Sequence, residues 1–327
     1  MSKTGWIILG ICLFLVFCLC AGLLLAGRLA TALYNGESKV DQGATKGYKD
    51  LKNPFSADGK YALSMDQLKE LRVDWISGSV IVELTDGDTI QLQETADRSI
   101  REKDALRYGI NGDTLRIQAC QKNYVGKLPK KDLVLSLPRS MVAGLKECEF
   151  DLVSATLSAE DLTLEELEVN TVSGRIELNG MTVEEAEVDT VSGDVLLRDC
   201  AFGTLRMDSV SALTSLTGTV KKAKASSVSG SIQLYLDDCR EVNISTMSGS
   251  VTLSFAKVPK ELRVDTASGD ADISLSKDAS CTVKLDSMSG KLLLNMENVP
   301  SKQIVLGDGE AKFDIDSMSG EVWIHTK

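Results

Sequence analysis

The residues that could carry chemistry in this chain are mainly aspartates that recur at one position of a repeated segment. Three residues before a recurring Ser-Gly or Ser-Ala dipeptide stands an aspartate, an asparagine or a serine. If the segments stack, these carboxylates form a column whose like charges must be solvated or neutralised by cations. The candidate Ca²⁺ ligands are therefore Asp189, Asp208, Asp265 and Asp286. The alternative is a set of solvent-facing turn residues that hydrogen-bond the local backbone, and two serines interrupt the column.

Other patterns typical of catalysis or metal binding are weak. His325 is the single histidine, which argues against a site built from several histidines and against a Ser-His-Asp triad. The five cysteines after the N-terminal apolar run form no CxxC pair, so we expect buried thiols. We predict a protein that is not an enzyme and has no cofactor. A glycan-processing β-helix enzyme is the alternative, but the dense basic groups, which are Lys127, Lys130 and Lys131 and then Lys221, Lys222 and Lys224, are expected to be solvated loops.

The elements that must position these residues follow from a repeat of about twenty residues. The segment Leu164–Leu178, LEELEVNTVSGRIEL, recurs almost intact as EEAEVDTVSGDVLL from Glu184 to Leu197. Between Ser154 and Ser289 the turn serines are spaced by 18 to 21 residues. A fixed period of this length is typical of stacked coils. The turn serines are Ser77, Ser154, Ser173, Ser192, Ser211, Ser229, Ser248, Ser268, Ser289 and Ser319.

Apolar residues alternate with period two on both sides of each turn, which predicts strands. Five residues after the turn serine the chain places Leu197, Leu216 and Leu234 in successive copies. We therefore predict an all-β fold, a β-solenoid or β-helix-like stack of about 20-residue coils, with these leucines buried in register. The glycine of each turn is expected to supply a positive φ. A leucine-rich strand–helix repeat is the alternative, and the units leave little room for its helix.

The N-terminal part predicts a membrane anchor. Residues 1–5 form a short tail, residues 6–33 one transmembrane helix, and residues 34–60 a polar tether. The charge-free stretch from Trp6 to Gly27 is long enough to cross a bilayer, and a cleaved signal peptide is the alternative. Lysines after the helix favour a cytoplasmic body, whereas the very short tail favours an extracytoplasmic one. We expect a single-pass protein of the cell membrane with an extracytoplasmic body.

The body is predicted to be one β-solenoid domain over residues 61–327, less regular over 61–150 and with regular coils over 151–327. The segment LRVDWISGSVIVEL (Leu71–Leu84) is already a repeat, with Val73 and Val80 expected to point inward. Asn111-Gly112 predicts a hairpin. The longer step between Ser289 and Ser319 predicts an insertion around Asn295 to Gly309. The last coil, turning at Ser319, is expected to end the stack, so its exposed edge needs a cap, guarding charges or another protomer.

These features together resemble a known family. An apolar anchor, then LRVDWISGSVIVEL, then LVLSLP (Leu133–Pro138), then serial V-x-T-V-S-G-x-I-x-L units is similar to the bacterial "putative adhesin" family of repeated β domains of unknown function. The resemblance covers about residues 61–327. It implies a bacterial, envelope-associated protein, with some relatives linked to envelope stress responses, and it carries no catalytic residues over. Two turns depart from the motif, with Ala155 and Ala212 in place of glycine.

Charge restricts the partners. The net charge is −11, and an acidic body argues against nucleic acid as a partner. We therefore expect a membrane-anchored binding or scaffold protein of the cell envelope, in adhesion or envelope stress, with an envelope protein or a glycan as partner. A membrane-attached protein that assembles with itself is a further alternative. The oligomeric state does not follow from the sequence.

Overall fold

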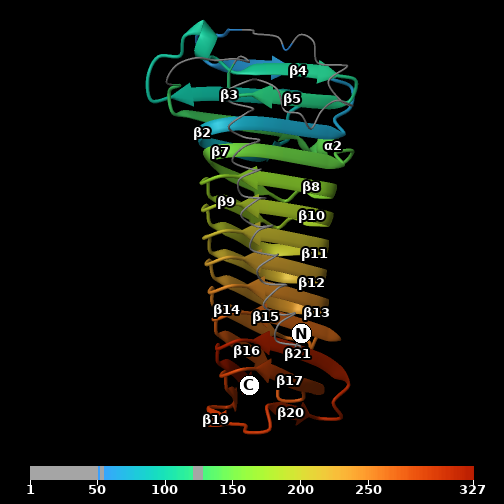
Figure 1. The fold of residues 1–327 in the computed structure, drawn as a ribbon. Coiled ribbons are helices and arrows are strands. Elements are labelled where there is room, and N and C mark those ends of the chain that lie inside the picture. The colour runs from blue at the N-terminus through green and yellow to red at the C-terminus, as the bar shows by residue number, and fades with distance from the viewer. Residues whose placement is uncertain (1–50, 52–54, 121–127) are drawn as a thin grey trace. The chain divides into compact units, whose positions relative to one another are not determined.

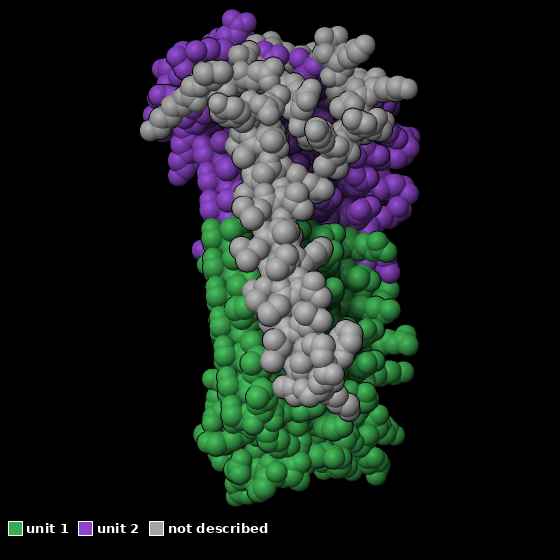
Figure 2. All heavy atoms as spheres, viewed as in Figure 1, with its two compact units in different colours: residues 1–22, 185–327 green, residues 23–184 purple. Residues whose placement is uncertain are grey.

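The computed structural model describes residues 51, 55–120 and 128–327, and nearly all of them lie in strands or the turns between strands (Figure 1). Within these residues no helix is both long and apolar enough to cross a membrane. The predicted anchor at 6–33 and most of the predicted tether lie outside the described residues. The described residues divide into two compact units, those up to Glu184 (unit 2) and Glu185–Lys327 (unit 1), and the division falls inside β10 (Thr182–Thr190) (Figure 2).

Unit 2 is built around one long strand, β2 (Glu70–Thr85). Its first half pairs in parallel with β5 on one side and β7 on the other, and its second half lies between β6 and β7. Antiparallel strands close the end beyond β5 and β6. The other elements are β1 (Lys60–Leu63), β3 (Ile90–Ala96), the 3₁₀ turn Glu102–Asp104, β4 (Arg107–Asn111), β5 (Thr114–Gln118), β6 (Lys131–Pro138), the short helix α2 (Arg139–Val142), β7 (Glu147–Glu160), β8 (Thr163–Thr171) and β9 (Ile176–Asn179).

Several local predictions for this less regular region are confirmed. Val73 and Val80 are buried, with exposed fractions of 1% and 0%. The Asn111-Gly112 turn joins β4 and β5 as a hairpin, and Gly112 has a φ of 62°. Leu133–Pro138 lies within β6. The alternation of apolar and polar residues was sufficient at these places because one face of each strand is buried.

Unit 1 is a stack of coils that form two columns of paired strands, and the longest strands contribute to both columns. The elements are β11 (Val195–Ser209), β12 (Thr214–Ser227), β13 (Ile232–Thr246), β14 (Val251–Phe255), β15 (Glu261–Thr266), β16 (Ala271–Leu275), β17 (Cys281–Ser287), β18 (Leu292–Leu294), β19 (Glu297–Asn298), β20 (Gln303–Leu306), β21 (Ala311–Ser317) and β22 (Val322–Thr326). In one column β11, β12, β13 and β15 pair in parallel, and in the other β11, β12, β13, β14 and β16 do so. The predicted ladder is confirmed: Leu197, Leu216 and Leu234 are opposite one another and at most 1% exposed.

From the turn at Ser173 on, a hydroxyl residue stands two positions before each turn serine, and it is buried in most copies. Where the turn has a glycine, this hydroxyl accepts a hydrogen bond from the glycine amide three residues on, as in Gly249 N to Thr246 Oγ1 at 3.0 Å and Gly269 N to Thr266 Oγ1 at 2.9 Å. The turn serine itself donates to a carbonyl of the preceding coil, as Ser248 Oγ does to Val228 O at 3.4 Å. Turns such as the one at Ser248 are therefore tied both within their own coil and to the neighbouring coil.

The expected reason for the turn glycines is wrong at most of these positions. Gly78 does have a φ of 100°, but Gly249 and Gly269 are not in the left-handed region. A Cβ on Gly249 would instead overlap the carbonyl oxygen of Gly230, and one on Gly269 would overlap that of Gly249. Coils that pair through their backbones at the turn approach so closely that a side chain has no room.

The last coil in the chain is not the last coil in the stack, which corrects the expected bare C-terminal edge. Strand β21 pairs with β15 on one side and β17 on the other, and β22 lies between β16 and β18. The C-terminal coil is thus inserted between two coils that precede it in sequence. The predicted insertion folds back as a cap, because β20 pairs antiparallel with β17 and β19 with β18.

Removal of residues 310–327 should therefore open the stack rather than shorten it. The coil Cys281–Leu294 would lose its parallel neighbours on the side of β15 and β16, where the gap is two strand spacings, about 9.6 Å. We expect a lower melting temperature and rapid proteolysis within residues 276–309, with the earlier coils of unit 1 protected. A chain that lacks only Lys327 is the control. Unchanged protection of residues 281–306 in the shortened chain would contradict the inserted arrangement.

Candidate functional site

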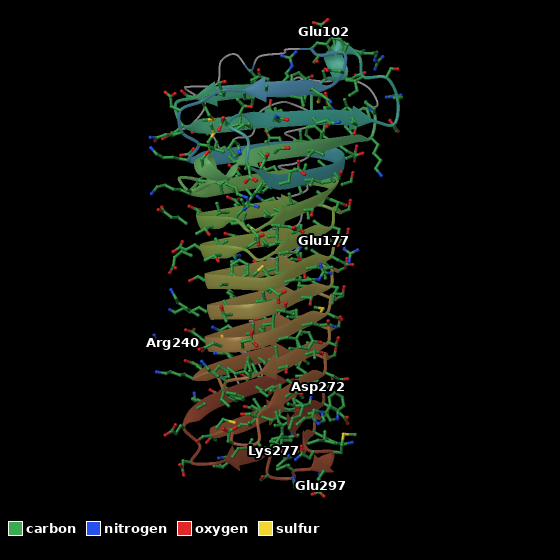
Figure 3. All side chains as sticks on the ribbon, turned by 180° about the vertical axis from the view of Figure 1, so that it is seen from behind. Glu102, Glu177, Arg240, Asp272, Lys277 and Glu297 are labelled. Carbon is green, nitrogen blue, oxygen red and sulfur yellow. The ribbon has the colours of Figure 1, made fainter. Side chains whose placement is uncertain are left out.

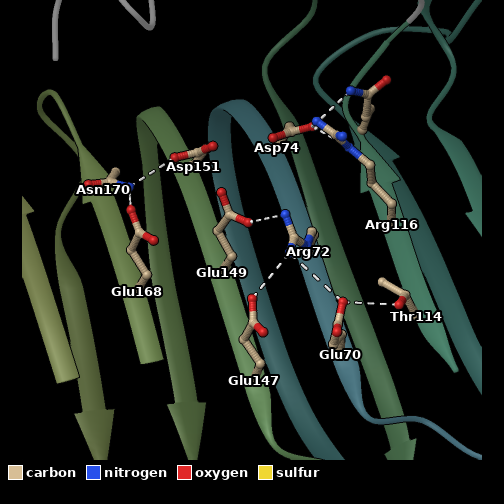
Figure 4. A network of polar contacts seen from close by, with 11 residues as sticks. Glu70, Arg72, Asp74, Thr114, Arg116, Glu147, Glu149, Asp151, Glu168 and Asn170 are labelled. Carbon is tan, nitrogen blue, oxygen red and sulfur yellow. Dashed lines mark hydrogen bonds and ion pairs between the residues drawn. The ribbon is translucent and has the colours of Figure 1, made fainter. Parts of the chain in front are cut away.

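The outer side of four neighbouring strands in unit 2 carries a regular array of polar side chains, which we call the acidic face (Figure 4). Because parallel strands pair in register, outward residues of β5, β2, β7 and β8 line up in three rows. Seven carboxylates surround two arginines. The rows are Thr114–Glu70–Glu147–Glu166, Arg116–Arg72–Glu149–Glu168 and Gln118–Asp74–Asp151–Asn170.

Arg72 is the central cation of this face. Its guanidinium lies 3.2 Å from Glu147 Oε1, 3.0 Å from Glu149 Oε2 and 3.8 Å from Glu70 Oε2. One positive charge thus serves three glutamates on two strands (Figure 4). Thr114 Oγ1 donates a further hydrogen bond to Glu70 at 3.0 Å. The arrangement holds the carboxylates in place but leaves an excess of negative charge.

In the third row, an arginine binds Asp74, whereas Asp151 accepts a hydrogen bond from an amide. Asp74 accepts hydrogen bonds from Arg116, at 3.0 Å to Nη2, and from Gln118, at 2.8 Å. Asp151 lies opposite Asp74 and accepts one hydrogen bond, at 3.1 Å, from the neutral amide of Asn170. Asn170 also donates to Glu168 at 2.8 Å. A neutral amide supplies hydrogen bonds without the charge that would stabilise an ionised carboxyl fully.

Burial and like charge act together on two of these carboxyls. Partial burial, with Asp151 and Glu168 adding negative charge nearby, raises the pKa of Glu149 to about 7, although Arg72 opposes the shift. Burial and the neighbouring Asp74 raise the pKa of Asp151 to about 6. The pKa of Glu147 is also raised, chiefly by burial. The acidic face therefore changes its charge between about pH 6 and pH 7, and a cation placed on it would favour the ionised forms.

The four predicted Ca²⁺ ligands do not come together as one group in unit 1. Asp208 is bound by Arg206, with 2.6 Å between Nη2 and Oδ2, and Asp265 by Arg263 at 3.0 Å. In register, the serines at 226 and 245 lie between those two aspartates. Asp286 is opposite Asp316 on the neighbouring strand, and Asp189 lies on β10. Within the described ranges no group of three or more acidic, histidine or cysteine side chains could hold a metal ion, and calcium binding stays a prediction.

A buried ion pair in unit 2 escaped the sequence analysis. Lys131, expected in a solvated loop, is 2% exposed, and its Nζ lies 2.5 Å from Glu94 Oε1. It also donates to the carbonyls of Asp104, at 2.7 Å, and Ala119, and lies 5.0 Å from the Trp75 ring centroid. Lys130, its neighbour in sequence, is exposed as expected. With several acceptors for one ammonium the group is well satisfied, and it joins β6, β3 and two loops at the closed end of the unit. The one sequence signal was alternation, since Lys131 falls in phase with Leu133 and Leu135.

The family model described as Toastrack DUF4097 matches residues 68–325. The chain belongs to this family. The match confirms the family resemblance, and the all-β coil stack is the Toastrack fold of this chain. No match was found among proteins with curated descriptions.

Solved structures similar to this Toastrack chain are distant in sequence. A "putative lipid binding protein" from Parabacteroides distasonis is 15% identical, with a TM-score of 0.48, and the match covers 86% of this chain and 98% of that one. A "putative adhesin" from Bacteroides fragilis is 11% identical, with a TM-score of 0.41 and coverage of 81% and 95%. Another from Parabacteroides merdae is 12% identical, with a TM-score of 0.37 and coverage of 86% and 98%.

The substitution Glu149→Gln should change how the free energy of unfolding depends on pH, because the pKa of the Glu149 carboxyl is raised in the folded chain. The folded-state pKa of about 7 lies above the ordinary value of 4.5. The stability that this carboxyl contributes is therefore full below about pH 4.5 and is lost as the pH rises through 7. Glutamine removes that loss, so the variant should gain about 1 kcal/mol relative to the native chain between pH 5 and pH 8.

Denaturant unfolding at a series of pH values measures this difference. The exposed Glu102 provides a matched control, because Glu102→Gln removes the same charge away from the acidic face. If native chain and Glu149→Gln lose stability in parallel from pH 5 to pH 8, the carboxyl is not held in an unfavourable ionised state.

Proposed function

We propose that this protein is a non-enzymatic binding protein of the bacterial cell envelope, anchored by residues 6–33 with its body outside the cytoplasm. The observation that carries the proposal is the acidic face, a flat array of carboxylates held in register by β-strand pairing and short of counter-charges. Its partner is a positively charged segment of another envelope protein. Roles in adhesion or in envelope stress are compatible with such binding.

The geometry favours binding over catalysis for a physical reason. Side chains on a parallel β-face are rigid and regularly spaced, and they present many charges to a partner over a flat area. The hydroxyls that could act as nucleophiles at the turns are committed to the backbone, as in Gly174 N to Thr171 Oγ1 at 2.9 Å. The face thus supplies electrostatic complementarity, which gives specificity and rapid association.

The pKa shifts explain how such a face remains stable without its partner. Glu149 and Asp151 carry protons at mildly acidic pH, which reduces repulsion among neighbouring carboxylates. An arriving ammonium or guanidinium group compensates the charges, and the protons leave. Binding should therefore tighten as pH rises from 5 to 8 and weaken with added salt.

A direct test measures binding of fluorescent decalysine to the full chain in a nonionic detergent. We expect affinity at low salt to be at least about tenfold higher at pH 8 than at pH 5, and the double substitution Glu149→Gln with Asp151→Asn to remove most of that pH dependence. The control Asp66→Asn with Glu102→Gln removes two exposed charges elsewhere in unit 2. Equal binding by both double variants would show that the acidic face is not the partner surface.

Anchoring and orientation need their own experiment. Protease added to intact spheroplasts should degrade the body beyond about residue 34, while a cytoplasmic marker stays intact. Antibodies against the body measure the loss, and permeabilised spheroplasts show that the protease can act. Protection of the body in intact spheroplasts would place it in the cytoplasm, as the lysines after the apolar segment favour.

A further inference from the structure

A second outward surface, in unit 1, differs in character from the rest of this acidic chain. It is formed by β13, β14, β16 and β22, which pair in parallel in that order. In register, Gln233, Thr252, Asp272 and Trp323 form one outward row. Tyr235 and His325 are the two ends of the adjacent row. We call these six residues the polar-aromatic face.

The two aromatic residues are the first unusual feature. Val322 and Ile324 are fully buried, so alternation turns the intervening Trp323 outward, where it is partly exposed. Tyr235 is 42% exposed, on the outer side of β13. Aromatic residues make up only 5% of the chain. Trp75, in contrast to Trp323, is buried in the core. The strands that carry the two rings lie three strand spacings apart, roughly 14 Å.

The side chains between the rings are short and polar. Gln233 and Thr252 offer an amide and a hydroxyl, and both are partly exposed. Asp272 is 46% exposed and lies 3.6 Å from His325 Nε2, so the one carboxylate of the six residues faces an imidazole. Asp272 is on the outer side of the strands in Figure 3. The surface between the rings therefore has hydrogen-bonding groups of both kinds and little net charge.

This combination matches an uncharged sugar chain. A sugar ring presents C–H groups on its faces, which pack on aromatic rings, and hydroxyls at its edge, which bond to amide, carboxylate, hydroxyl and imidazole groups. A basic segment would find too few carboxylates here, and an anionic polymer would find no lysine or arginine among the six residues. The separation of the rings requires a ligand longer than one sugar ring, lying across the strands.

We propose that the polar-aromatic face binds an extended, uncharged oligosaccharide, with Tyr235 and Trp323 each stacking on a sugar ring. Asp272 and His325 orient the hydroxyls between them, and the regular strand spacing supports a ligand that runs across the coils from β13 to β22. The site is separate from the acidic face in sequence and in ligand chemistry. Each can fail without the other.

The test uses the full chain in a detergent without a sugar headgroup, so that the detergent cannot occupy the site. Isothermal titration with chitohexaose and with cellohexaose, each up to about 10 mM, measures affinity for uncharged chains. A polygalacturonate oligomer of similar length tests an anionic chain. We expect at least one uncharged hexasaccharide to bind, and the anionic oligomer to bind at least about tenfold more weakly.

Variants locate the binding surface. Trp323→Ala and Tyr235→Ala should each weaken binding of the uncharged oligosaccharide at least about tenfold, and Trp323→Phe should retain most of it. Phe55, 43% exposed in unit 2, gives the matched control Phe55→Ala, which should bind as the native chain does. Melting temperatures show whether each variant folds. If Trp323→Ala does not fold, Tyr235→Ala remains informative, because Tyr235 is at an exposed position.

Two results would overturn the proposal. The first is no binding of either uncharged hexasaccharide by the native chain. The second is binding that the folded Tyr235 and Trp323 variants retain in full. Neither result bears on decalysine binding, so the acidic face is judged separately.

Discussion

The close backbone pairing of successive coils is the constraint on which the rest of each unit depends. Parallel pairing aligns most strand residues with a counterpart in the neighbouring coil, from Leu216 opposite Leu234 inside to Arg263 opposite Asp314 outside. At the turns the coils approach so closely that the carbonyl of Gly230 occupies the space of a side chain on Gly249. The buried hydroxyl of Thr246 then satisfies the amide of Gly249 that the turn leaves unpaired.

Pairing in register places like residues of a repeated sequence side by side. This stabilises the apolar residues, which pack together in the core, but it destabilises the outer surface where repeated acidic residues form columns of like charge. In unit 1 the column is relieved by arginines such as Arg206 and Arg263 next to their aspartates. In unit 2 the relief is incomplete, and burial together with the neighbouring carboxylates raises the pKa values of Glu149 and Asp151. Surfaces of this kind are suited to a partner that supplies the missing charge.

At the ends of the stacks, strands from distant parts of the sequence pair with the edge strands and cover them. In unit 1 the coil of β21 and β22 fills a place between earlier coils, and the antiparallel strands β19 and β20 cover the last one. In unit 2 antiparallel strands also close one end, where Lys131 and Glu94 form a buried ion pair. Both devices deal with open sheet edges, which would otherwise recruit other strands.

The sequence by itself determined the coil, its length, its turns and its inward residues. These follow from local alternation and from a turn chemistry that recurs in each copy, so Val73, Leu197 and Leu216 could be assigned to the core directly. The aspartate column could be recognised for the same reason, as could the insertion near residue 300. Position within one repeat depends on neighbours a few residues away.

Only the tertiary structure decided which coils are neighbours at the ends and which outward residues share a surface. Pairing of β21 between β15 and β17 joins segments whose order in the stack differs from their order in the chain, and no local pattern encodes that choice. The same holds for Lys131, whose burial depends on Glu94 and two distant carbonyls, and for Tyr235 and Trp323, which share a face across three strand pairings. Strand pairing is set by which edges are available once the other coils have formed, and that is a property of the folded chain as a whole.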